Sequence, residues 1–314
     1  MRLKDWLLIA LLLILVYGIA LVHIQDDSLW RDEGWSAWIV YDGAIEADSL
    51  RDLARDIVSS PLDALGRVIE HDLHPPLYYL VLDAFTLAAG ESVLVLRLPS
   101  LLAGMLALAA TYALAWRLMD RRAALYALIL LGTASFLIYY TREARSYALW
   151  LALTAISTLL YVRWSARPGW RRALAYGLGL ALLLYTHYLS VIVAAVHVLH
   201  LLLWRPRGRI ITWPLPYVLA GLLFVPWIPA ALRQQATYPG GPLGIAPASD
   251  AGTLLAFWLI LSSGLGGWMV LPFIFGRGLP MLRHDAGARR LMGLALMGLL
   301  IPTAIIFALN AWVS

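Results

Sequence analysis

The sequence has 314 residues, of which 61% are hydrophobic and 14% are charged. Soluble domains contain about 45–50% apolar and about 25% charged residues, so this composition excludes an ordinary soluble domain and indicates a membrane protein. The net charge of +5 comes from basic residues in short loops between apolar runs, which argues against a nucleic-acid-binding surface. The absence of cysteine excludes disulfides and thiolate metal sites.

Apolar runs that are long enough to cross a bilayer recur along the whole chain. A spanning helix needs about 20 apolar residues. This criterion predicts nine spans, at 6–24, 98–116, 123–140, 146–162, 171–186, 188–204, 210–232, 253–275 and 291–313. No small-x-small cleavage site precedes Gln25, so the first span is expected to be an uncleaved helix. We therefore expect an all-α, polytopic membrane helix bundle in which residues 1–314 form a single transmembrane domain.

The basic loops set the expected orientation of these spans. Arginine-rich loops at 117–122, 163–172, 205–209 and 277–290 fall on one side, which the positive-inside rule makes cytoplasmic. This holds only if the short apolar run 76–89 does not cross, so it is expected to be a re-entrant or interfacial helix. The protein is then a multi-pass protein of the inner (plasma) membrane.

Two extracytoplasmic loops follow from this topology. The loop over 25–97 holds most acidic residues, and apolar residues at helical spacing in 50–58 and in 62–69, after Pro61, predict juxtamembrane helices there. The second loop, 233–252, is rich in glycine and proline and is either a mobile lid or a plain linker.

The interiors of the predicted spans carry no Asp, Glu, Lys or Arg, so polar chemistry is expected in the outer loops. Asp32 and Glu33 follow the first span, and paired carboxylates can divide the roles of general base and orienting group. A solvated acidic loop is the alternative, although the neighbouring Trp30, Trp35 and Trp38 favour a pocket or an interface.

Three further polar clusters lie on the same outer side. His74 precedes the proline-stiffened segment that contains Tyr78, and either caps a helix or binds a metal or a phosphate. The turn with Arg142, Glu143, Arg145 and Tyr147 either recognises a phosphate or anchors lipid headgroups. His187 lies at a helix end, where a histidine is more often structural, and His197 and His200 within the next span are expected to be structural. Because one topology places all the outer clusters on one side, we expect them to share a cavity.

The order of these motifs resembles a known superfamily. Asp32-Glu33, His74-Pro75-Pro76-Leu77-Tyr78-Tyr79, Arg97-Leu98-Pro99-Ser100, Tyr140-Thr141-Arg142-Glu143-Ala144-Arg145-Ser146-Tyr147 and Tyr185-Thr186-His187-Tyr188 occur in this sequence. Over roughly residues 1–230 they resemble the GT-C superfamily of membrane glycosyltransferases, in particular bacterial members akin to protein O-mannosyltransferases and aminoarabinose lipid A transferases.

The resemblance implies a sugar donor linked to a polyprenyl phosphate and transfer with inversion to an extracytoplasmic hydroxyl on a lipid, a glycan or a protein. Asp32 and Glu33 would be catalytic, with Asp32 as the base. Arg97, Arg142 and Arg145 would face the phosphate, and the expected substrate-binding set is completed by His74, Tyr78, Glu143, Tyr147 and His187. Membrane lipid is an expected partner and nucleic acid is not.

Metal dependence stays open, because some relatives supply a metal ligand at the position of His74. The candidates for a divalent ion are Asp32, His74, Glu143 and His187, and no tight ligand spacing such as HExxH is present. No glycine-rich nucleotide cradle follows a strand, which makes a nucleotide-sugar donor the weaker choice.

Two other functions compete with this interpretation. A polyprenyl-phosphate or lipid transporter (a flippase) would use the same arginines without reaction, although uncharged span interiors weigh against it. A non-catalytic membrane scaffold would need none of these side chains. Many relatives continue with further helices or a soluble domain, whereas this chain stops at Ser314, at the end of a predicted span, so it is either a short member or part of a longer protein.

Overall fold

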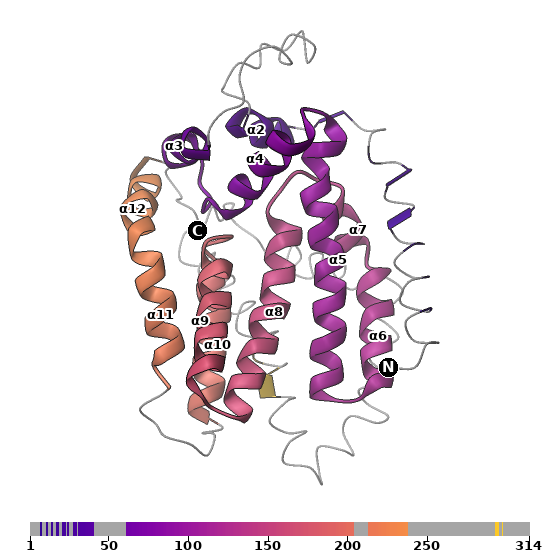
Figure 1. Ribbon diagram of the computed structural model, residues 1–314, viewed down its shortest axis with the longest axis vertical. Coiled ribbons are helices and arrows are strands. Elements are labelled where there is room, and N and C mark those ends of the chain that lie inside the picture. The colour runs from indigo at the N-terminus through magenta and orange to yellow at the C-terminus, as the bar shows by residue number, and fades with distance from the viewer. Residues whose placement is uncertain are drawn as a thin grey trace, which may run out of the picture.

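The computed structural model describes residues 28–29, 31–40, 61–203 and 213–237, together with isolated positions between 7 and 24 and at 293, 294 and 297. Within these ranges every regular element is a helix and no strand occurs. Long helices stand side by side as a bundle, and short helices cover one end of it (Figure 1). The all-α class predicted from the sequence is therefore confirmed.

Three segments of the described chain are long and apolar enough to cross a membrane. They are α5 (Val93–Leu118), α8 (Tyr147–Ala166) and the continuous stretch Leu215–Thr237, which comprises α11 (Leu215–Phe224), a 3-10 turn (Val225–Trp227) and α12 (Ile228–Thr237). A fourth is counted if α6 (Arg121–Gly132) and α7 (Ser135–Thr141) form one span, although they meet at a bend of 61°. The predicted spans 253–275 and 291–313, and most of 6–24, lie outside the described residues.

Three predicted boundaries are corrected. The helix predicted to begin at residue 98 begins at Val93, where the Ser92 side chain accepts a hydrogen bond from the Val95 amide at 3.2 Å and caps it. The predicted loop 25–97 is shorter by the same residues. The span predicted to end at 232 continues as a helix to Thr237, so residues 233–237 of the predicted second outer loop are helical, and 238–252 lie outside the described residues.

The long apolar stretch from 171 is divided as predicted. It forms α9 (Trp170–Leu184) and α10 (Ser190–Leu203), which are separated at Tyr185–Leu189. With 15 and 14 residues, both helices are shorter than the roughly 20 residues that a straight crossing needs. Their break places His187 at the end of the bundle where the short helices lie.

The cap consists of α2 (Arg31–Val40), α3 (Pro61–His71) and α4 (Leu77–Ala89) (Figure 1). Helix α3 begins at Pro61, as predicted, and the helix predicted at 50–58 lies outside the described residues. Helix α4, with 13 residues, is one of the shorter apolar helices, and whether it crosses the membrane stays a prediction. The cap is tied to the bundle, because the Leu77 amide donates to the Tyr185 carbonyl at 3.0 Å and the Gln234 side-chain amide donates to the Val68 carbonyl at 3.0 Å.

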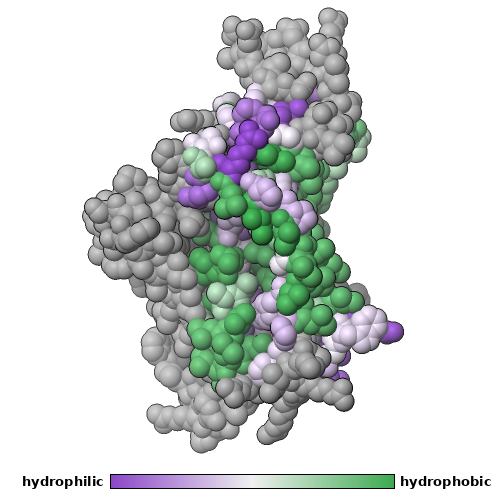
Figure 2. Space-filling model, turned by 90° about the vertical axis from the view of Figure 1, so that its left-hand side faces the viewer, coloured by the Kyte–Doolittle hydropathy of each residue, from purple (hydrophilic) through white to green (hydrophobic). Residues whose placement is uncertain are grey.

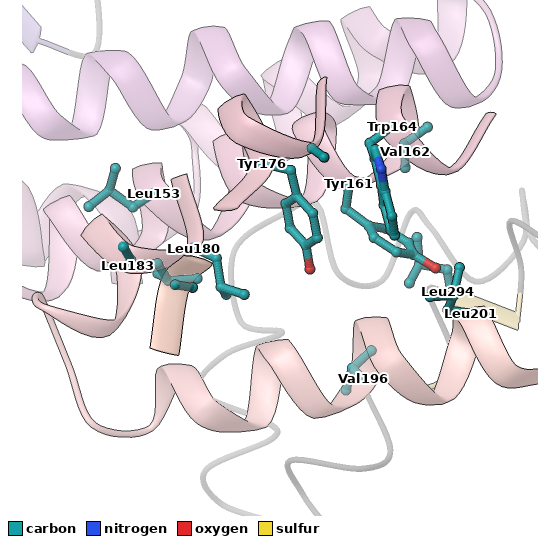
Figure 3. Packing of buried hydrophobic residues seen from close by; sticks show 13 residues of the cluster. Leu153, Tyr161, Val162, Trp164, Tyr176, Leu180, Leu183, Val196, Leu201 and Leu294 are labelled. Atoms are coloured by element: carbon teal, nitrogen blue, oxygen red, sulfur yellow. The ribbon is translucent and has the colours of Figure 1, made fainter. Parts of the chain in front are cut away.

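The interior of the bundle is filled by aromatic and aliphatic side chains. Away from the cap, Tyr161 and Trp164 of α8 and Tyr176 of α9 pack together, with the Trp164 and Tyr176 rings stacked at 5.6 Å (Figure 3). The helices approach closely where glycine allows it. A Cβ at Gly104 of α5 would overlap the Thr141 methyl group at the end of α7. This contact sets how near α5 lies to the turn that follows α7.

Candidate functional site

A buried ion pair joins α2, α5 and the turn at 142–146, three segments that are far apart in the sequence. The Arg97 Nε and Nη2 atoms donate to the two carboxylate oxygens of Glu33 at 2.8 and 2.7 Å. Glu33 Oε1 also accepts the amide of Ala144 at 2.9 Å. The side chains of Glu33 and Arg97 are 1% and 3% exposed, so the pair is shielded from water. Geometrically it fixes the helix that carries Asp32 against the turn that carries Glu143 and Arg145.

A second set of hydrogen bonds fixes the same turn from the side of α4 and α5. The Ser100 hydroxyl lies 3.1 Å from the Arg145 carbonyl and 2.9 Å from the Tyr78 hydroxyl. Tyr78 is fully buried, and this burial raises the pKa of its hydroxyl. Its hydroxyl therefore takes part in supporting the turn.

Asp72 is the centre of the hydrogen bonding in the cap, and the sequence analysis did not select it. Its Oδ2 accepts Trp35 Nε1 at 3.0 Å and the Tyr79 hydroxyl at 2.9 Å. Its Oδ1 accepts the amide of His74 at 2.6 Å and His74 Nδ1 at 2.9 Å. Burial alone raises the Asp72 pKa, but the hydrogen bonds and charge of His74 and the charge of Arg145 outweigh it, so the pKa is lowered. The only sequence signal was a carboxylate two residues before His74.

His74, just before α4, packs against His187, which lies in the break between α9 and α10. The rings of His74 and His187 lie 5.6 Å apart in an edge-on arrangement, and the His187 ring stacks on Trp150 at 4.7 Å. His187 Nδ1 accepts the Leu189 amide at 3.1 Å, which leaves Nε2 as the protonated nitrogen of the neutral ring. Burial, with the nearby charges of His74 and Arg145, lowers the His187 pKa to about 3, so the ring is neutral at ordinary pH.

Glu143 and Arg145 are two buried charged groups with unused hydrogen-bonding atoms. Their side chains are 5% and 7% exposed. Arg145 Nη1 donates to the Tyr79 hydroxyl at 3.4 Å, while Arg145 Nε and Glu143 Oε2 have no hydrogen-bond partner among the described residues. Burial raises the pKa of Glu143. The Tyr139 hydrogen bond and the charge of Arg145 act to lower this pKa but do not outweigh burial. Such groups are rare in folded proteins and call for a ligand, ion or water as partner.

The remaining predicted residues border this cluster. The Asp32 side chain is partly exposed, and its negative charge is close enough to raise the pKa of both Glu143 and Arg145. Arg142 and Tyr147 are also partly exposed, and the Tyr147 ring lies 4.6 Å from that of Tyr140. The structure thus gathers the predicted residues at one end of the bundle, with Glu33, Arg97 and Tyr78 buried and Asp32 at the surface.

The four metal candidates do not form a ligand set. No group of three His, Asp or Glu side chains within the described residues is arranged to hold an ion. His74 and His187 each use Nδ1 in a hydrogen bond within the protein.

A model of the dolichyl-phosphate-mannose-protein mannosyltransferase family matches residues 73–232, a little more than half of the chain. This range runs from the residue before His74 to the middle of α12, and so contains Arg97, the 142–146 turn and His187. No curated protein and no solved structure matches the chain at a significant level.

Proposed function

Because the chain belongs to the dolichyl-phosphate-mannose-protein mannosyltransferase family, and is thus a membrane glycosyltransferase of the GT-C type, we propose that it moves a sugar from a polyprenyl phosphate to a hydroxyl group. In this reaction the acceptor oxygen attacks the anomeric carbon, the bond from that carbon to the phosphate oxygen breaks, and the sugar is transferred with inversion. The acceptor proton goes to Asp32, and the lipid phosphate leaves as an anion.

The observation that carries this proposal is the buried, incompletely hydrogen-bonded guanidinium of Arg145 beside an acidic helix. A lipid phosphate is a good leaving group, so it needs positive charge where negative charge develops more than it needs an acid. Arg145 Nε has an open donor among the described residues, and guanidinium groups bind phosphate oxygens in pairs. Arg142, partly exposed on the same turn, adds a second cation.

Asp32 is the better candidate for the base of the two neighbouring carboxylates. Glu33 is fully engaged by Arg97 and the Ala144 amide, whereas the Asp32 side chain is partly exposed. A base must reach the acceptor hydroxyl, which an exposed carboxylate can do. We assign Glu33 and Arg97 to positioning Asp32 and Arg145, and Asp72 to orienting His74 next to His187.

The family match favours this enzyme over the transporter and the scaffold. The proposed extracytoplasmic location of the site rests on the arginine-rich loops, which the topology puts at the opposite end of the bundle from the cap. One such loop joins α8 to α9 with Arg167 and Arg172, away from the cap (Figure 1).

The decisive experiment replaces Asp32 by Asn in proteoliposomes that contain a radiolabelled polyprenyl-phosphate sugar. Loss of a general base lowers the transfer rate by about 100- to 10,000-fold. Asp120→Asn is the matched control, because Asp120 caps α6 at the other end of the bundle and asparagine caps equally well. Transfer by Asp32→Asn at the rate of the Asp120 control would end the base assignment.

A further inference from the structure

The surface of α2 carries a stacked pair of tryptophan rings next to the proposed base. Trp35 is 42% exposed, and its ring stacks on that of Trp38 with the centroids 5.0 Å apart. The Trp38 ring in turn meets the His71 ring of α3 edge-on at 5.1 Å. A stacked indole pair that reaches the surface is a large apolar area, and such areas with a polar border mark binding sites.

Asp32 and Trp35 lie on the same side of α2. They are three residues apart, which places their Cβ atoms about 5–6 Å from each other on a helix. Both side chains reach the surface, whereas Glu33, Ala37 and Ile39 are buried. This separation is comparable with the width of a single sugar ring. A ring that packs on Trp35 can therefore present its edge to the Asp32 carboxylate.

The tryptophan pair is held in place by hydrogen bonds. Trp35 Nε1 donates to Asp72 Oδ2 at 3.0 Å, which fixes the indole plane. Arg67 of α3 donates from Nε to the Ile39 carbonyl at 2.5 Å and from Nη2 to the Val40 carbonyl at 3.5 Å. These carbonyls lie at the end of α2, where the helix itself offers no partner, so the bonds fix α2 against α3. A surface that is rigid before binding loses little entropy when a ligand packs on it.

Carboxylates stand at both ends of the tryptophan pair. Asp32 precedes Trp35 on α2, and Glu70 of α3 is 55% exposed, with its Oε2 atom 3.7 Å from Nε2 of His71. A carboxylate accepts hydrogen bonds from hydroxyl groups, and the negative face of an indole attracts polarised C–H bonds. A saccharide offers both, since its hydroxyls lie at the ring edge and its C–H bonds on the ring faces. An anionic lipid head group would meet negative charge at both ends.

Tryptophan is also common at membrane interfaces, but α2 does not resemble a helix that rests on lipid. Such a helix turns an apolar face to the bilayer. Within Arg31–Val40 the aliphatic side chains Ala37, Ile39 and Val40 are all buried. Helices α2 and α3 lie at the outer end of the molecule (Figure 1), and on the face seen in Figure 2 hydrophilic residues gather near the cap, above a mostly hydrophobic bundle. This placement favours a water-soluble ligand for the tryptophan pair.

We propose that Trp35 and Trp38, with Asp32 and Glu70 at their ends, bind a saccharide, and that this saccharide is the sugar acceptor. The assignment as acceptor rests on the proposed function. A pyranose ring packs on Trp35, and one of its hydroxyls gives its proton to Asp32. The hydroxyl oxygen forms the new bond to the anomeric carbon of the donor sugar. The bond from that carbon to the phosphate oxygen breaks, and its electron pair leaves with the phosphate.

Binding is tested without a donor, by applying the full chain in phosphatidylcholine nanodiscs to a printed array of neutral and amino-sugar oligosaccharides. Trp35→Leu should weaken binding about tenfold, as expected when an aromatic contact is lost. Trp116→Leu is the matched control, because Trp116 is 43% exposed near the other end of the bundle and its ring also contacts an aromatic neighbour, Tyr112. It should bind as the wild type does. Absence of binding to every oligosaccharide, or equal binding by the two variants, would overturn the proposal.

Trp35→Phe separates the aromatic ring from its hydrogen bond. Trp35→Leu and Trp35→Phe both lose the bond to Asp72, but phenylalanine keeps an aromatic face. Trp35→Phe should therefore retain most of the binding, and thermal melts of the two variants should agree. If Trp35→Phe binds as weakly as Trp35→Leu, the loss acts through Asp72, and the aromatic surface is not the binding site.

The acceptor role is tested with a radiolabelled polyprenyl-phosphate sugar and three acceptors offered together: the oligosaccharide that binds best on the array, phosphatidylglycerol vesicles and a serine- and threonine-containing peptide. The label should appear on the oligosaccharide. Trp35→Leu should raise the KM for the oligosaccharide about tenfold and leave the KM for the donor unchanged. Label that appears only on lipid or peptide would overturn the acceptor role.

The array also separates this proposal from the proposed function, because it needs no turnover. If Asp32→Asn transfers normally while array binding still depends on Trp35, the proposed base fails and the saccharide surface stands. If Asp32→Asn is inactive while Trp35→Leu binds and transfers as Trp116→Leu does, the base stands and the saccharide surface is overturned.

Discussion

The two ends of the molecule both contain buried histidines among aromatic rings, but they use their polar atoms differently. Away from the cap, His197 has both ring nitrogens engaged, Nδ1 with the Tyr176 hydroxyl at 2.8 Å and Nε2 with the Thr158 hydroxyl at 3.2 Å. At the cap, His187 uses only Nδ1 within the described chain, and Glu143 and Arg145 keep unused atoms. Burial alone therefore does not distinguish structural from functional polar groups. Open hydrogen bonds also occur away from the cap, at Trp164 Nε1 and Ser157 Oγ, but these atoms belong to neutral side chains, whereas Glu143 and Arg145 are ionisable.

The largest expected effect tests whether the cap depends on the buried ion pair between Glu33 and Arg97. Glu33→Ala leaves Arg97 buried without its carboxylate partner, which typically costs about 3–5 kcal/mol. The unfolding midpoint of the detergent-solubilised protein should fall strongly. The double variant Glu33→Leu with Arg97→Met should regain much of this stability, because a hydrophobic pair replaces a buried ion pair well. A midpoint unchanged in Glu33→Ala would contradict the role of the pair.

Asp72→Asn tests whether Asp72, the centre of hydrogen bonding in the cap, contributes to catalysis as well as to stability. An amide has one acceptor oxygen where the carboxylate has two, so it cannot hold Trp35, Tyr79 and both donors of His74 together. Misplacement of His74 should lower kcat by about 100-fold. The KM for the donor should change little. A variant that melts early but turns over normally when folded would make Asp72 purely structural.

The two histidines provide the most direct test of the comparison. Phenylalanine preserves the stack of His197 on Tyr161 at 4.4 Å and that of His187 on Trp150. His197→Phe breaks the hydrogen bonds of the Tyr176 and Thr158 hydroxyls to the ring, although Thr158 keeps its bond to the Thr154 carbonyl, and should cost about 1–3 kcal/mol of stability. His187→Phe should cost less than that, since it breaks only the bond to the Leu189 amide, and should lower transfer about tenfold if His187 Nε2 donates to the substrate, as its predicted substrate-binding role implies. Thermal melts and transfer assays on both variants measure these effects. Equal losses of stability in His197→Phe and His187→Phe would contradict the distinction between the two histidines.

The smallest expected effect is a dependence of the free energy of unfolding on pH, which comes from Glu143. Its pKa is raised in the folded protein by burial, so between the ordinary carboxyl pKa and the raised value the folded state binds more protons than the unfolded state. The free energy of unfolding contributed by this group therefore falls as pH rises through that window. Glu143→Gln should flatten this slope in melts recorded across the window, and a slope that survives the substitution belongs to another group.

The sequence predicted the bundle because the length of an apolar run is a local property. It predicted α8 within a few residues, the division at 185–189 and the helix after Pro61. It misplaced the start of α5, since Arg97 was taken as the polar edge of a span. Arg97 lies inside the helix because Glu33, 64 residues away, neutralises it. Hydropathy carries no information on such a pairing.

The same limit explains what the sequence analysis missed at the site. It identified the segments, since each carries charged or histidine residues beside an apolar run. Asp72 escaped it, because three of the four hydrogen bonds that define its role come from side chains, two of them on α2 and α4. The helix α2 was also not predicted, because its ten residues mix tryptophan with charge and have no clear apolar face.

The bend between α6 and α7 has a consequence for the surrounding bilayer. The twelve residues of α6 rise about 18 Å, and α7, tilted by 61° from them, adds only about 5 Å along the same direction. The hydrocarbon layer is about 30 Å thick. If α6 and α7 form one span, the layer along this side of the bundle must thin locally or admit water. Under the proposed function, a lipid phosphate that approaches the turn at 142–145 from this side would then cross less of the hydrocarbon layer than it would beside a straight helix.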